Sequence, residues 1–231
     1  MNSLDIDKIL NKLGIQELNE MQNATSEAIL HSDKDIVVLS QTGSGKTLAY
    51  LLPLLQRLDV ESDDVQAVII VPGRELALQS ATVLQNMGSG FRCCACYGGR
   101  ATMDEHKVLR QVKPQVIFAT PGRLNDHLDK DNIIPDNIRY VVIDEFDKCL
   151  EMGFSEEMNA VISKLPNVER RILLSATDAE SIPRFVNMGR TIRIDFLIDD
   201  EQVPERVQIF KVLSPEKDKL DIIRHTQTIL D

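Results

Sequence analysis

Residues Ser40–Thr47, which read SQTGSGKT, constrain the fold more than any other part of the chain. The segment follows a short apolar run, Ile36–Leu39, and opens an amphipathic stretch that begins at Lys46. Glycines in such a turn let the backbone wrap closely around phosphate oxygens, and the amides of a helix N-terminus offer them partial positive charge. The sequence therefore predicts a strand, a phosphate-binding loop and a helix in succession.

Two side chains at the end of this loop suit a nucleotide bound with Mg²⁺. The Lys46 ammonium can reach the β- and γ-phosphates, and the Thr47 hydroxyl can ligate the metal. A glycine-rich turn with a chance lysine is the alternative, but it leaves the flanking strand and helix unexplained. The loop residues predicted to bind the nucleotide are Gln41, Thr42, Gly43, Ser44, Gly45, Lys46 and Thr47.

An acidic motif, DEFD at positions 144–147, follows the apolar run Tyr140–Ile143. A carboxylate at the C-terminal end of a parallel strand faces the crevice in which open α/β sheets bind ligands. Asp144 is placed to hold Mg²⁺ through water, and Glu145 to orient and deprotonate an attacking water. A solvated acidic turn is the alternative, but the phosphate loop upstream favours a nucleotide site. The predicted catalytic residues are Lys46, Asp144 and Glu145.

Short apolar runs alternate with amphipathic stretches along most of the chain. The runs predicted as strands are Ile36–Leu39, Ala67–Val71, Arg92–Tyr97, Val116–Ala119, Tyr140–Ile143, Arg171–Leu174 and Ile192–Phe196. The predicted helices are Lys46–Leu58, with a kink or shift at Pro53, and Glu75–Asn86, Thr102–Val112, Arg123–Leu128, Glu156–Leu165 and Ala179–Met188. Nearly all-apolar strands that alternate with helices favour an α/β fold, a mostly parallel sheet with helices on both faces.

The domain organisation is predicted from both ends of the chain. Residues 1–30 read as a helical segment before the first strand, and residues 31–204 form the main domain. The acidic stretch Asp199–Glu201, followed by Pro204, is typical of a linker. A strand at Val207–Leu213 and a helix at Glu216–Leu230 are too short to bury a core. Residues 205–231 are therefore interpreted as a linker and the truncated start of a second domain.

Composition and termini exclude several classes of protein. The net charge of −10 argues against a protein that coats nucleic acid through its overall charge, although it permits a local phosphate-binding groove. No apolar run approaches the roughly 18 residues of a membrane span. The first residues lack the basic segment and apolar core of a secretory signal, so a cytoplasmic location without a membrane partner is expected.

The four cysteines do not have the spacing of zinc ligands. Three of them, Cys93, Cys94 and Cys96, lie in one apolar segment, and Cys149 is far from them in the sequence. A disulfide is not expected in a cytosolic chain. The cysteines are therefore predicted to be reduced and buried.

Four further short motifs occur along the chain: Pro72–Ala77, Gly98–Gly99, Thr120–Arg123 and Ser175–Thr177. They have the same order as in the DEAD-box RNA helicases of superfamily 2, and the chain resembles the N-terminal RecA-like domain of that family. Each is too short to carry weight alone, but the resemblance covers nearly the whole chain. It implies a RecA-like P-loop NTPase fold.

The resemblance also implies roles for residues outside the phosphate loop. The residues that would contact the RNA backbone, without reading its sequence, are Arg74, Gly99, Thr120 and Arg123. Those that would couple the nucleotide site to a second RecA-like domain of the same protein are Asp147, Ser175 and Thr177.

The segment from Gly14 to Gln22 resembles the adenine-recognition segment of the family. A glutamine amide can pair with adenine N6 and N7 in bidentate fashion, so Gln22 is predicted to select ATP over GTP. An ordinary exposed glutamine on a helix is the alternative. Ile15 stands where the family has an aromatic side chain that stacks on adenine, and this aliphatic contact predicts a modest affinity for ATP.

Other positions depart from the family pattern. Ser40 stands where the helicases usually have Ala, and Gly73 replaces a Thr, which removes a hydroxyl but keeps the backbone amide. Phe146 replaces the Ala of the DEAD motif, beside the predicted base. Its bulk is either absorbed by repacking or incompatible with catalysis.

The function implied is that of an RNA-dependent ATPase, the ATP-binding domain of an RNA helicase, with ATP and Mg²⁺ as cofactors and RNA as partner. No arginine motif of a second domain is recognisable after Pro204, so this chain alone is expected to bind nucleotide but hydrolyse it poorly. One alternative is an ATP- or RNA-binding regulatory module without catalysis. Another is a different P-loop enzyme, such as a small-molecule kinase, which has no need of the Gly-Gly and Thr-Pro-Gly-Arg elements.

Overall fold

A computed structural model describes residues 4–99, 102–178 and 182–197 of the chain. The predicted strand Val207–Leu213 and helix Glu216–Leu230 lie outside the described residues, so the division into residues 1–30, 31–204 and 205–231 stays a prediction. Within the described part, no helix has the length and apolar character that crossing a membrane requires.

The described residues form one seven-stranded sheet in the order β3-β4-β2-β5-β6-β1-β7, and every neighbouring pair is parallel. The strands are β1 Asp35–Ser40, β2 Ala67–Ile70, β3 Cys93–Cys96, β4 Val116–Ala119, β5 Tyr140–Ile143, β6 Arg170–Ser175 and β7 Thr191–Phe196. The predicted strands agree with these to within about one residue at each end.

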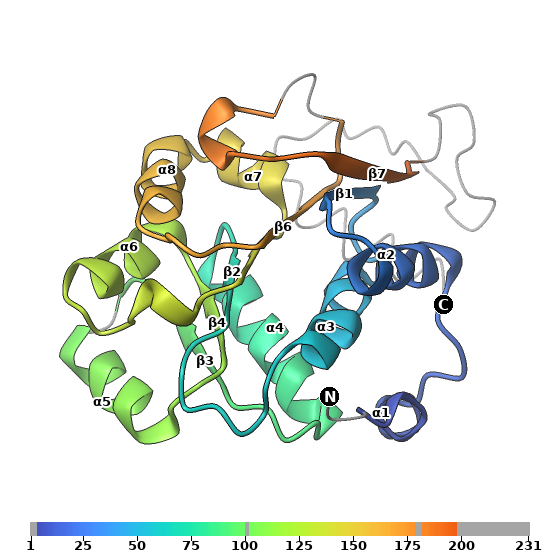
Figure 1. Cartoon of the computed structure of the whole chain (residues 1–231), viewed down its shortest axis with the longest axis horizontal. Coiled ribbons are helices and arrows are strands. Elements are labelled where there is room, and N and C mark those ends of the chain that lie inside the picture. The colour runs from blue at the N-terminus through green and yellow to red at the C-terminus, as the bar shows by residue number, and fades with distance from the viewer. Residues whose placement is uncertain (1–3, 100–101, 179–181, 198–231) are drawn as a thin grey trace, which may run out of the picture. The chain divides into compact units, whose positions relative to one another are not determined.

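The helices are α1 Ile6–Leu13, α2 Glu20–His31, α3 Lys46–Arg57, α4 Arg74–Met87, α5 Thr102–Val112, α6 Pro121–Asp129, α7 Phe146–Glu151 and α8 Ser155–Ser163, with short 3₁₀ helices η1 Pro135–Asn137 and η2 Arg184–Val186. Figure 1 shows their arrangement. Helix α3 continues through Pro53 rather than ending there. The two helices α1 and α2 agree with the helical reading of the N-terminal segment.

One helix prediction is wrong and one helix was not predicted. The described part of Ala179–Met188 holds only η2, because Pro183 lacks a backbone N–H and Asn187 adopts a left-handed φ of 55°. Conversely, α7 begins at Phe146, directly after the acidic pair, and its six residues are too few to show a helical period.

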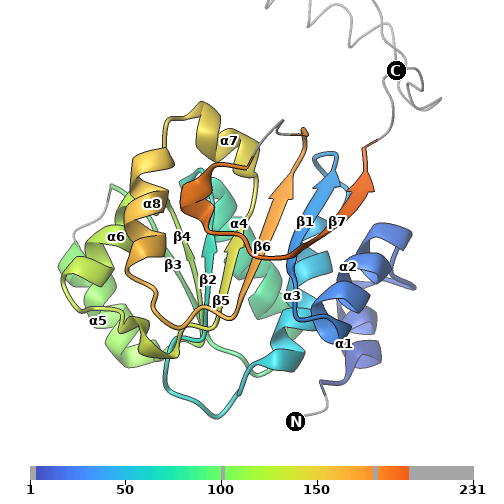
Figure 2. The same cartoon turned by 45° about the horizontal axis from the view of Figure 1, so that its top comes forward.

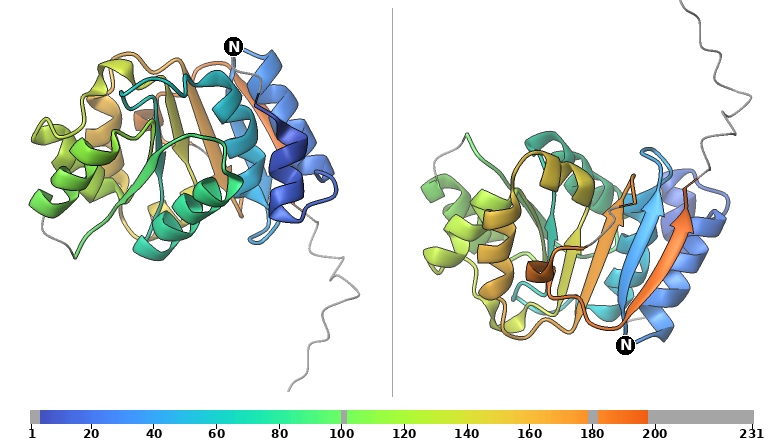
Figure 3. Two further views of the ribbon diagram at one scale, coloured as in Figure 1. Left: turned by 90° about the horizontal axis from the view of Figure 1, so that it is seen from below. Right: turned by 90° about the horizontal axis from the view of Figure 1, so that it is seen from above.

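Two apolar layers enclose the sheet, one on each face. Side chains of α1 to α4 pack on one face, which includes Val38 of β1 and Val142 of β5. Side chains of α5 to α8 pack on the other, which includes Val37, Leu39 and Val141. Figure 2 shows the sheet between these helices, and Figure 3 shows α1 and α2 on the side of β1 and β7. Burial on both faces explains why the strands β2, β4 and β5 are almost wholly apolar, whereas the edge strand β7 is largely exposed and carries polar residues.

The strand order decides which segments become neighbours at the carboxyl edge of the sheet. β6 lies between β1, which leads into the phosphate loop, and β5, which leads into the acidic motif. β4 lies between β3 and β2, so the segments after these three strands form a second group. The sheet thus separates two halves of the edge: one, called the nucleotide half below, holds the residues predicted to bind nucleotide, and the other holds the predicted RNA contacts.

Phe146 points into the core rather than toward the acidic pair. Its side chain is fully buried in the layer formed by α5 to α8, together with Cys149 and Met158. The large side chain at this position is therefore absorbed by the packing of the core.

Replacing this side chain by alanine tests that packing role. We expect Phe146→Ala to lower the free energy of unfolding by about 3 to 5 kcal/mol, because it removes a buried ring and leaves a cavity. Urea denaturation measures the change. Met152→Ala, on an exposed side chain just after α7, is the control and should change stability by less than about 0.5 kcal/mol. A loss below about 1 kcal/mol for Phe146→Ala would contradict the buried position.

Candidate active site

The phosphate loop lies between β1 and α3 and depends on two glycines. Gly43 and Gly45 have φ values of 84° and 90°, in the left-handed region that other residues rarely adopt. A Cβ atom on Gly45 would also collide with the amide nitrogen of Gln22. Gly45 is thus required by its own backbone conformation, and a side chain there would also displace the Gln22 amide.

Lys46 is the first residue of α3 and is buried. Its Nζ donates to the carbonyl oxygens of Ser40 at 2.6 Å and Gln41 at 3.2 Å, so the ammonium lies inside the curve of its own loop. Burial lowers the pKa of Lys46, while the nearby carboxylate of Asp144 opposes that effect. A desolvated ammonium held in this position can pair with a polyphosphate.

Ser40, the departure at the start of the loop, is accommodated by a hydrogen bond. Its hydroxyl donates to the Ser44 hydroxyl at 2.6 Å, so the side chain supports the turn from within. The other loop residues predicted to contact nucleotide are exposed or half-buried: Gln41, Thr42, Gly43, Ser44, Gly45 and Thr47.

The predicted adenine-recognition residue Gln22 contacts the phosphate loop directly. Its Nε2 donates to the Gly45 carbonyl at 3.2 Å, and its Oε1 accepts the backbone N–H of Asn19 at 3.0 Å. Asn19 caps α2 in return and donates to the Ser44 carbonyl at 3.0 Å. Ile15 is half-buried against the first core layer. The structure therefore joins the N-terminal segment to the loop, while the adenine contact stays a prediction.

Asp144 directly follows β5 and is a buried residue, 2% exposed. Its Oδ1 accepts the backbone N–H of Glu145 at 3.0 Å. Burial raises the pKa of Asp144 to about 6, although the nearby Lys46 ammonium lowers it. Glu145 has a left-handed φ of 50°, which is strained for a side chain of this size and sets its carboxylate at the start of α7. The charges of both carboxylates act on Lys46 and raise its pKa, against the larger effect of burial.

Tyr50 on α3 belongs to this site and was missed from the sequence. Its ring is fully buried, and burial and then the Asp144 charge raise its pKa well above the ordinary value. An apolar helix face gives no sign of such a phenol, because tyrosine is common in cores. The single indication in the sequence is that Tyr50 comes three residues after Thr47 and so lies about one helical turn from it.

Three residues predicted to couple the site to a second domain touch one another. The Thr177 hydroxyl donates to Asp147 Oδ2 at 3.1 Å, and the Ser175 hydroxyl donates to the Thr177 carbonyl at 2.7 Å. Asp147 is buried at the start of α7, whereas Thr177 is exposed. The end of β6 is thereby joined to the acidic motif after β5.

The predicted RNA contacts gather at the other half of the edge. Arg74 is the first residue of α4, Gly99 has a left-handed φ of 89°, and Thr120 is the N-cap of α6. Arg123 lies in the first turn of α6, with its side chain 11% exposed. The structure therefore brings the four predicted residues to one edge of the sheet, separate from the phosphate loop.

The four cysteines are buried, as predicted. Burial raises the thiol pKa of Cys94 to about 11 and those of Cys93 and Cys149 to about 12. The thiol of Cys96 shows the same direction of change. Protonated buried thiols are inert, so these side chains act as small apolar groups.

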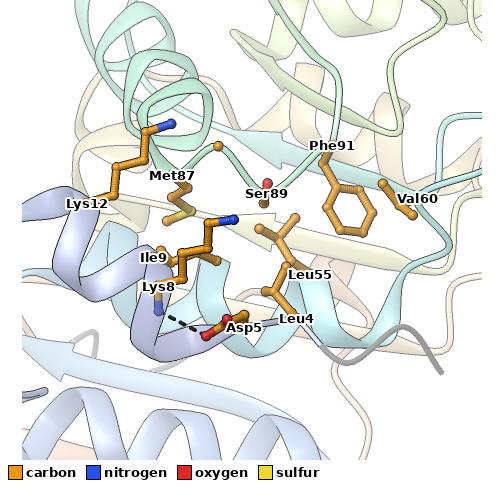
Figure 4. A pocket seen from close by; sticks show the side chains of 11 residues that line it. Leu4, Asp5, Lys8, Ile9, Lys12, Leu55, Val60, Met87, Ser89 and Phe91 are labelled. Atoms are coloured by element: carbon orange, nitrogen blue, oxygen red, sulfur yellow. Dashed lines mark hydrogen bonds between the residues drawn. The ribbon is translucent and has the colours of Figure 1, made fainter.

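A cavity of about 520 Å³ lies away from all of these groups (Figure 4). It is enclosed by α1, by the ends of α3 and α4, and by the segment after α4, with Lys8 and Lys12 at its rim. Because α3 and α4 begin at the carboxyl edge of the sheet, their ends lie at the opposite edge. The predicted site residues do not line it.

A comparison with known proteins is consistent with this arrangement. The sequence profile of the DEAD/DEAH box helicases matches residues 19–185, which include the phosphate loop, the acidic motif and the residues after β2, β3, β4 and β6. The chain belongs to the DEAD/DEAH box helicase family.

Curated relatives of similar sequence are RNA helicases of the same family. ATP-dependent RNA helicase CshA of Limosilactobacillus reuteri is 34% identical over 97% of this chain and 45% of its own length. CshA of Bacillus subtilis is 33% identical over 96% of the chain and 45% of the relative. The chain therefore spans about half the length of these relatives.

Two solved structures show the same fold. A hypothetical ATP-dependent RNA helicase from Sulfolobus tokodaii superposes with a TM-score of 0.75 at 30% identity, covering 85% of this chain and 57% of its own. The helicase Mss116, described as bound to single-stranded RNA and UDP-BeF, gives 0.77 at 27% identity, covering 88% and 45%. These helicases confirm the predicted RecA-like α/β fold.

The buried charge of Asp144 leads to a prediction about stability. The folded-state pKa of about 6 lies above the ordinary 3.8, so the folded chain binds more protons than the unfolded chain between about pH 4 and pH 6. The carboxylate therefore lowers stability as the pH rises through that window. We expect Asp144→Asn to raise the free energy of unfolding by roughly 3 kcal/mol at pH 7.5 and by less than about 1 kcal/mol at pH 4.

Urea denaturation at both pH values, without nucleotide or metal, measures this difference. Asp136→Asn is the matched control, because Asp136 is exposed on η1 and lies away from the site. A destabilised Asp144→Asn chain at pH 7.5 would contradict the prediction.

Proposed function

We propose that the chain is the ATP-binding first domain of an RNA-dependent ATPase that separates RNA duplexes locally. The observation that carries the proposal is the arrangement at the nucleotide half of the edge. There the buried Lys46 ammonium and the buried Asp144 carboxylate influence each other's charge beside a loop built on Gly43 and Gly45. Opposite charges at a phosphate loop are what a metal–polyphosphate complex requires.

The residues fit ATP with Mg²⁺. The loop amides and Lys46 would bind the phosphates, and Gln22, which already contacts Gly45, would bind the adenine. The Thr47 hydroxyl and the Asp144 carboxylate are the hard oxygen ligands that Mg²⁺ prefers, and a cation would relieve the unfavourable burial of the Asp144 charge. The metal would neutralise charge on the phosphates.

In the hydrolytic step, Glu145 orients a water molecule and accepts its proton. The left-handed backbone at this position holds the carboxylate at the start of α7, beside the metal ligand Asp144. Asp147, Ser175 and Thr177 would pass the state of this site to the chain after β6, because their hydrogen bonds link the acidic motif after β5 to the end of β6.

RNA would bind along the other half of the edge through Arg74, Gly99, Thr120 and Arg123. Arginine side chains and amides at helix starts contact phosphates without reading bases, which suits an enzyme that acts on many RNAs. The relative Mss116 is described as bound to single-stranded RNA, which supports this assignment. Because the chain has a net charge of −10, its overall charge does not attract RNA. RNA binding should therefore be weak and depend on these four residues.

The chain covers about 45% of the helicases that it resembles, so a second RecA-like domain of the same protein is proposed to complete the site. Arginines of that domain would stabilise charge on the transferred phosphoryl group, an effect worth roughly 10³ to 10⁵ in rate. We therefore expect this chain alone to bind MgATP but hydrolyse it poorly. The alternative of a module without catalysis is weakened, because Phe146 is packed inside the core.

Nucleotide binding is tested at the phosphate loop. We expect Lys46→Ala to lower the affinity for MgATP at least about tenfold, because a charge-assisted contact to phosphate is lost. Glu145→Gln should change it less than about threefold, since its role comes after binding. Titration with a fluorescent ATP analogue measures both, and Lys107→Ala, on an exposed lysine of α5, is the control. Failure of the parent chain to bind MgATP in this titration would refute the proposed function.

Base selection is tested at Gln22. We expect the chain to prefer ATP to GTP by about tenfold or more, as a bidentate amide contact provides, and Gln22→Ala to lose the preference. The control is Asn19→Ala, which breaks the same helix cap but leaves the glutamine amide in place. Equal binding of ATP and GTP by the parent chain would rule out this role.

A further inference from the structure

A buried carboxylate lies beneath the proposed RNA-binding half of the edge. Glu105 is on α5, and its side chain is 5% exposed. Its Oε1 accepts the backbone N–H of Tyr97 at 3.2 Å, and its Oε2 contacts the His127 Nε2 at 2.9 Å. The carboxylate therefore connects the turn after β3 with helix α6.

Arg123, one of the proposed RNA contacts, is held beside this carboxylate. Its Nε lies 3.5 Å from Glu105 Oε2, and its NH1 donates to the Thr102 hydroxyl at 2.7 Å. Thr102 in turn donates to Asp126 at 2.9 Å. The guanidinium is thus held by Glu105 and Thr102 of α5, and the Asp126 carboxylate of its own helix lies 3.9 Å from its NH1.

The same carboxylate is connected to Arg74 through Tyr97. The Tyr97 ring is buried, and the Arg74 guanidinium lies over it, 5.0 Å from the ring centroid. A cation above an aromatic face is attracted to it and restricted in its orientations. The Glu105 bond to the Tyr97 amide thus fixes the backbone that presents this ring.

The strand order places the residues of these contacts, which follow β2, β3 and β4, next to one another. β4 lies between β3 and β2, and hydrogen bonds continue past the strand ends: Thr120 N–H donates to the Cys96 carbonyl at 3.1 Å, and Val71 N–H to the Ala119 carbonyl at 3.0 Å. The segments that carry Tyr97, Thr120 and Arg74 are therefore held next to one another by backbone hydrogen bonds.

A metal site is the other interpretation of this cluster. Donor atoms of Cys96, Glu105 and His127 lie within 4.8 Å of one another. However, His127 and Glu105 already contact each other, the Asn132 amide reaches the other imidazole nitrogen at 3.1 Å, and an arginine lies beside the carboxylate. A cation would have to break these contacts next to a positive charge, so the observations favour a hydrogen-bonded network.

We propose that Glu105 is a positioning residue for RNA binding: its carboxylate orients Arg123 directly and supports Arg74 through the Tyr97 backbone. The proposal rests on the proposed function, since it concerns RNA bound at this edge. A long arginine side chain loses much rotamer freedom when it contacts a phosphate, and an internal partner reduces that cost beforehand. A guanidinium has five N–H donors in a rigid fork, so it can contact a carboxylate and a phosphate together.

RNA affinity tests the proposal in the whole chain. Fluorescence anisotropy with labelled single-stranded RNA at low salt would compare the parent with Arg74→Ala, Arg123→Ala, Glu105→Ala and Glu105→Gln. We expect Glu105→Ala to weaken binding about tenfold, like Arg123→Ala, because one charge-assisted contact is misplaced. The amide of Glu105→Gln can still accept hydrogen bonds, so this variant should recover affinity to within about threefold of the parent.

Three controls separate positioning from general damage. The double variant Glu105→Ala with Arg123→Ala should bind no more weakly than either single variant, because both remove the same contact. Asp104→Ala removes a neighbouring exposed charge of α5 and should not weaken RNA binding. MgATP affinity should be unchanged in Glu105→Ala, because its network lies in the other half of the edge.

Arginine side-chain NMR provides a readout that does not depend on RNA or on the alanine variant being folded. The Nε–Hε signal of Arg123 in the parent should move in Glu105→Gln, since the charge beside it disappears, and the signal of Arg193, which pairs with Asp178 and Asp195, should not move. An unmoved Arg123 signal would overturn the proposal.

The RNA-binding results distinguish a failure of the positioning role from a failure of the proposed function. If Arg74→Ala and Arg123→Ala weaken RNA binding but Glu105→Ala binds as tightly as the parent, or more tightly, the positioning role is wrong and the proposed function survives. Additive losses in the double variant would also contradict the positioning role. If neither arginine affects RNA binding, the proposed RNA edge fails, and the role of Glu105 fails with it.

Discussion

Parallel pairing of every strand is the constraint on which the rest of the structure depends. Because parallel strands end at the same edge, segments separated by more than a hundred residues become neighbours there, such as those after β1 and β5. The order of strands then determines which neighbours meet. With β6 between β1 and β5, and β4 between β3 and β2, one edge carries two adjacent but chemically different surfaces.

Much of this could be predicted from the sequence, and for physical reasons. Apolar strands such as Val116–Ala119 are visible because burial on both faces leaves no room for polar residues. The phosphate loop is visible because Gly43 and Gly45 take backbone conformations that other residues avoid. When burial or backbone conformation restricts the residue type at a position, the restriction can be recognised in the sequence around that position. The positions of Lys46 and Asp144 followed from such signals once the sheet was assumed to be parallel.

What could not be predicted depends on contacts between distant residues. Glu105 reads as a surface residue of an amphipathic helix, and only the fold buries it against Tyr97 and His127. Tyr50 reads as an ordinary core residue until α3 places its phenol near Asp144. Residues 179–188 read as a helix by composition, yet Pro183 prevents one in the described part. In each case the deciding partner is far along the chain or a single backbone restriction outweighs the pattern.

The approach of Gln22 to Gly45 has a consequence for how such a domain can evolve. A methyl group on this glycine would collide with the glutamine amide nitrogen, so the amide would have to leave its position against the loop. If the proposed function holds, a substitution at position 45 would disturb the sites for the base and for the triphosphate in a single step. A substitution at position 22 would disturb the site for the base alone.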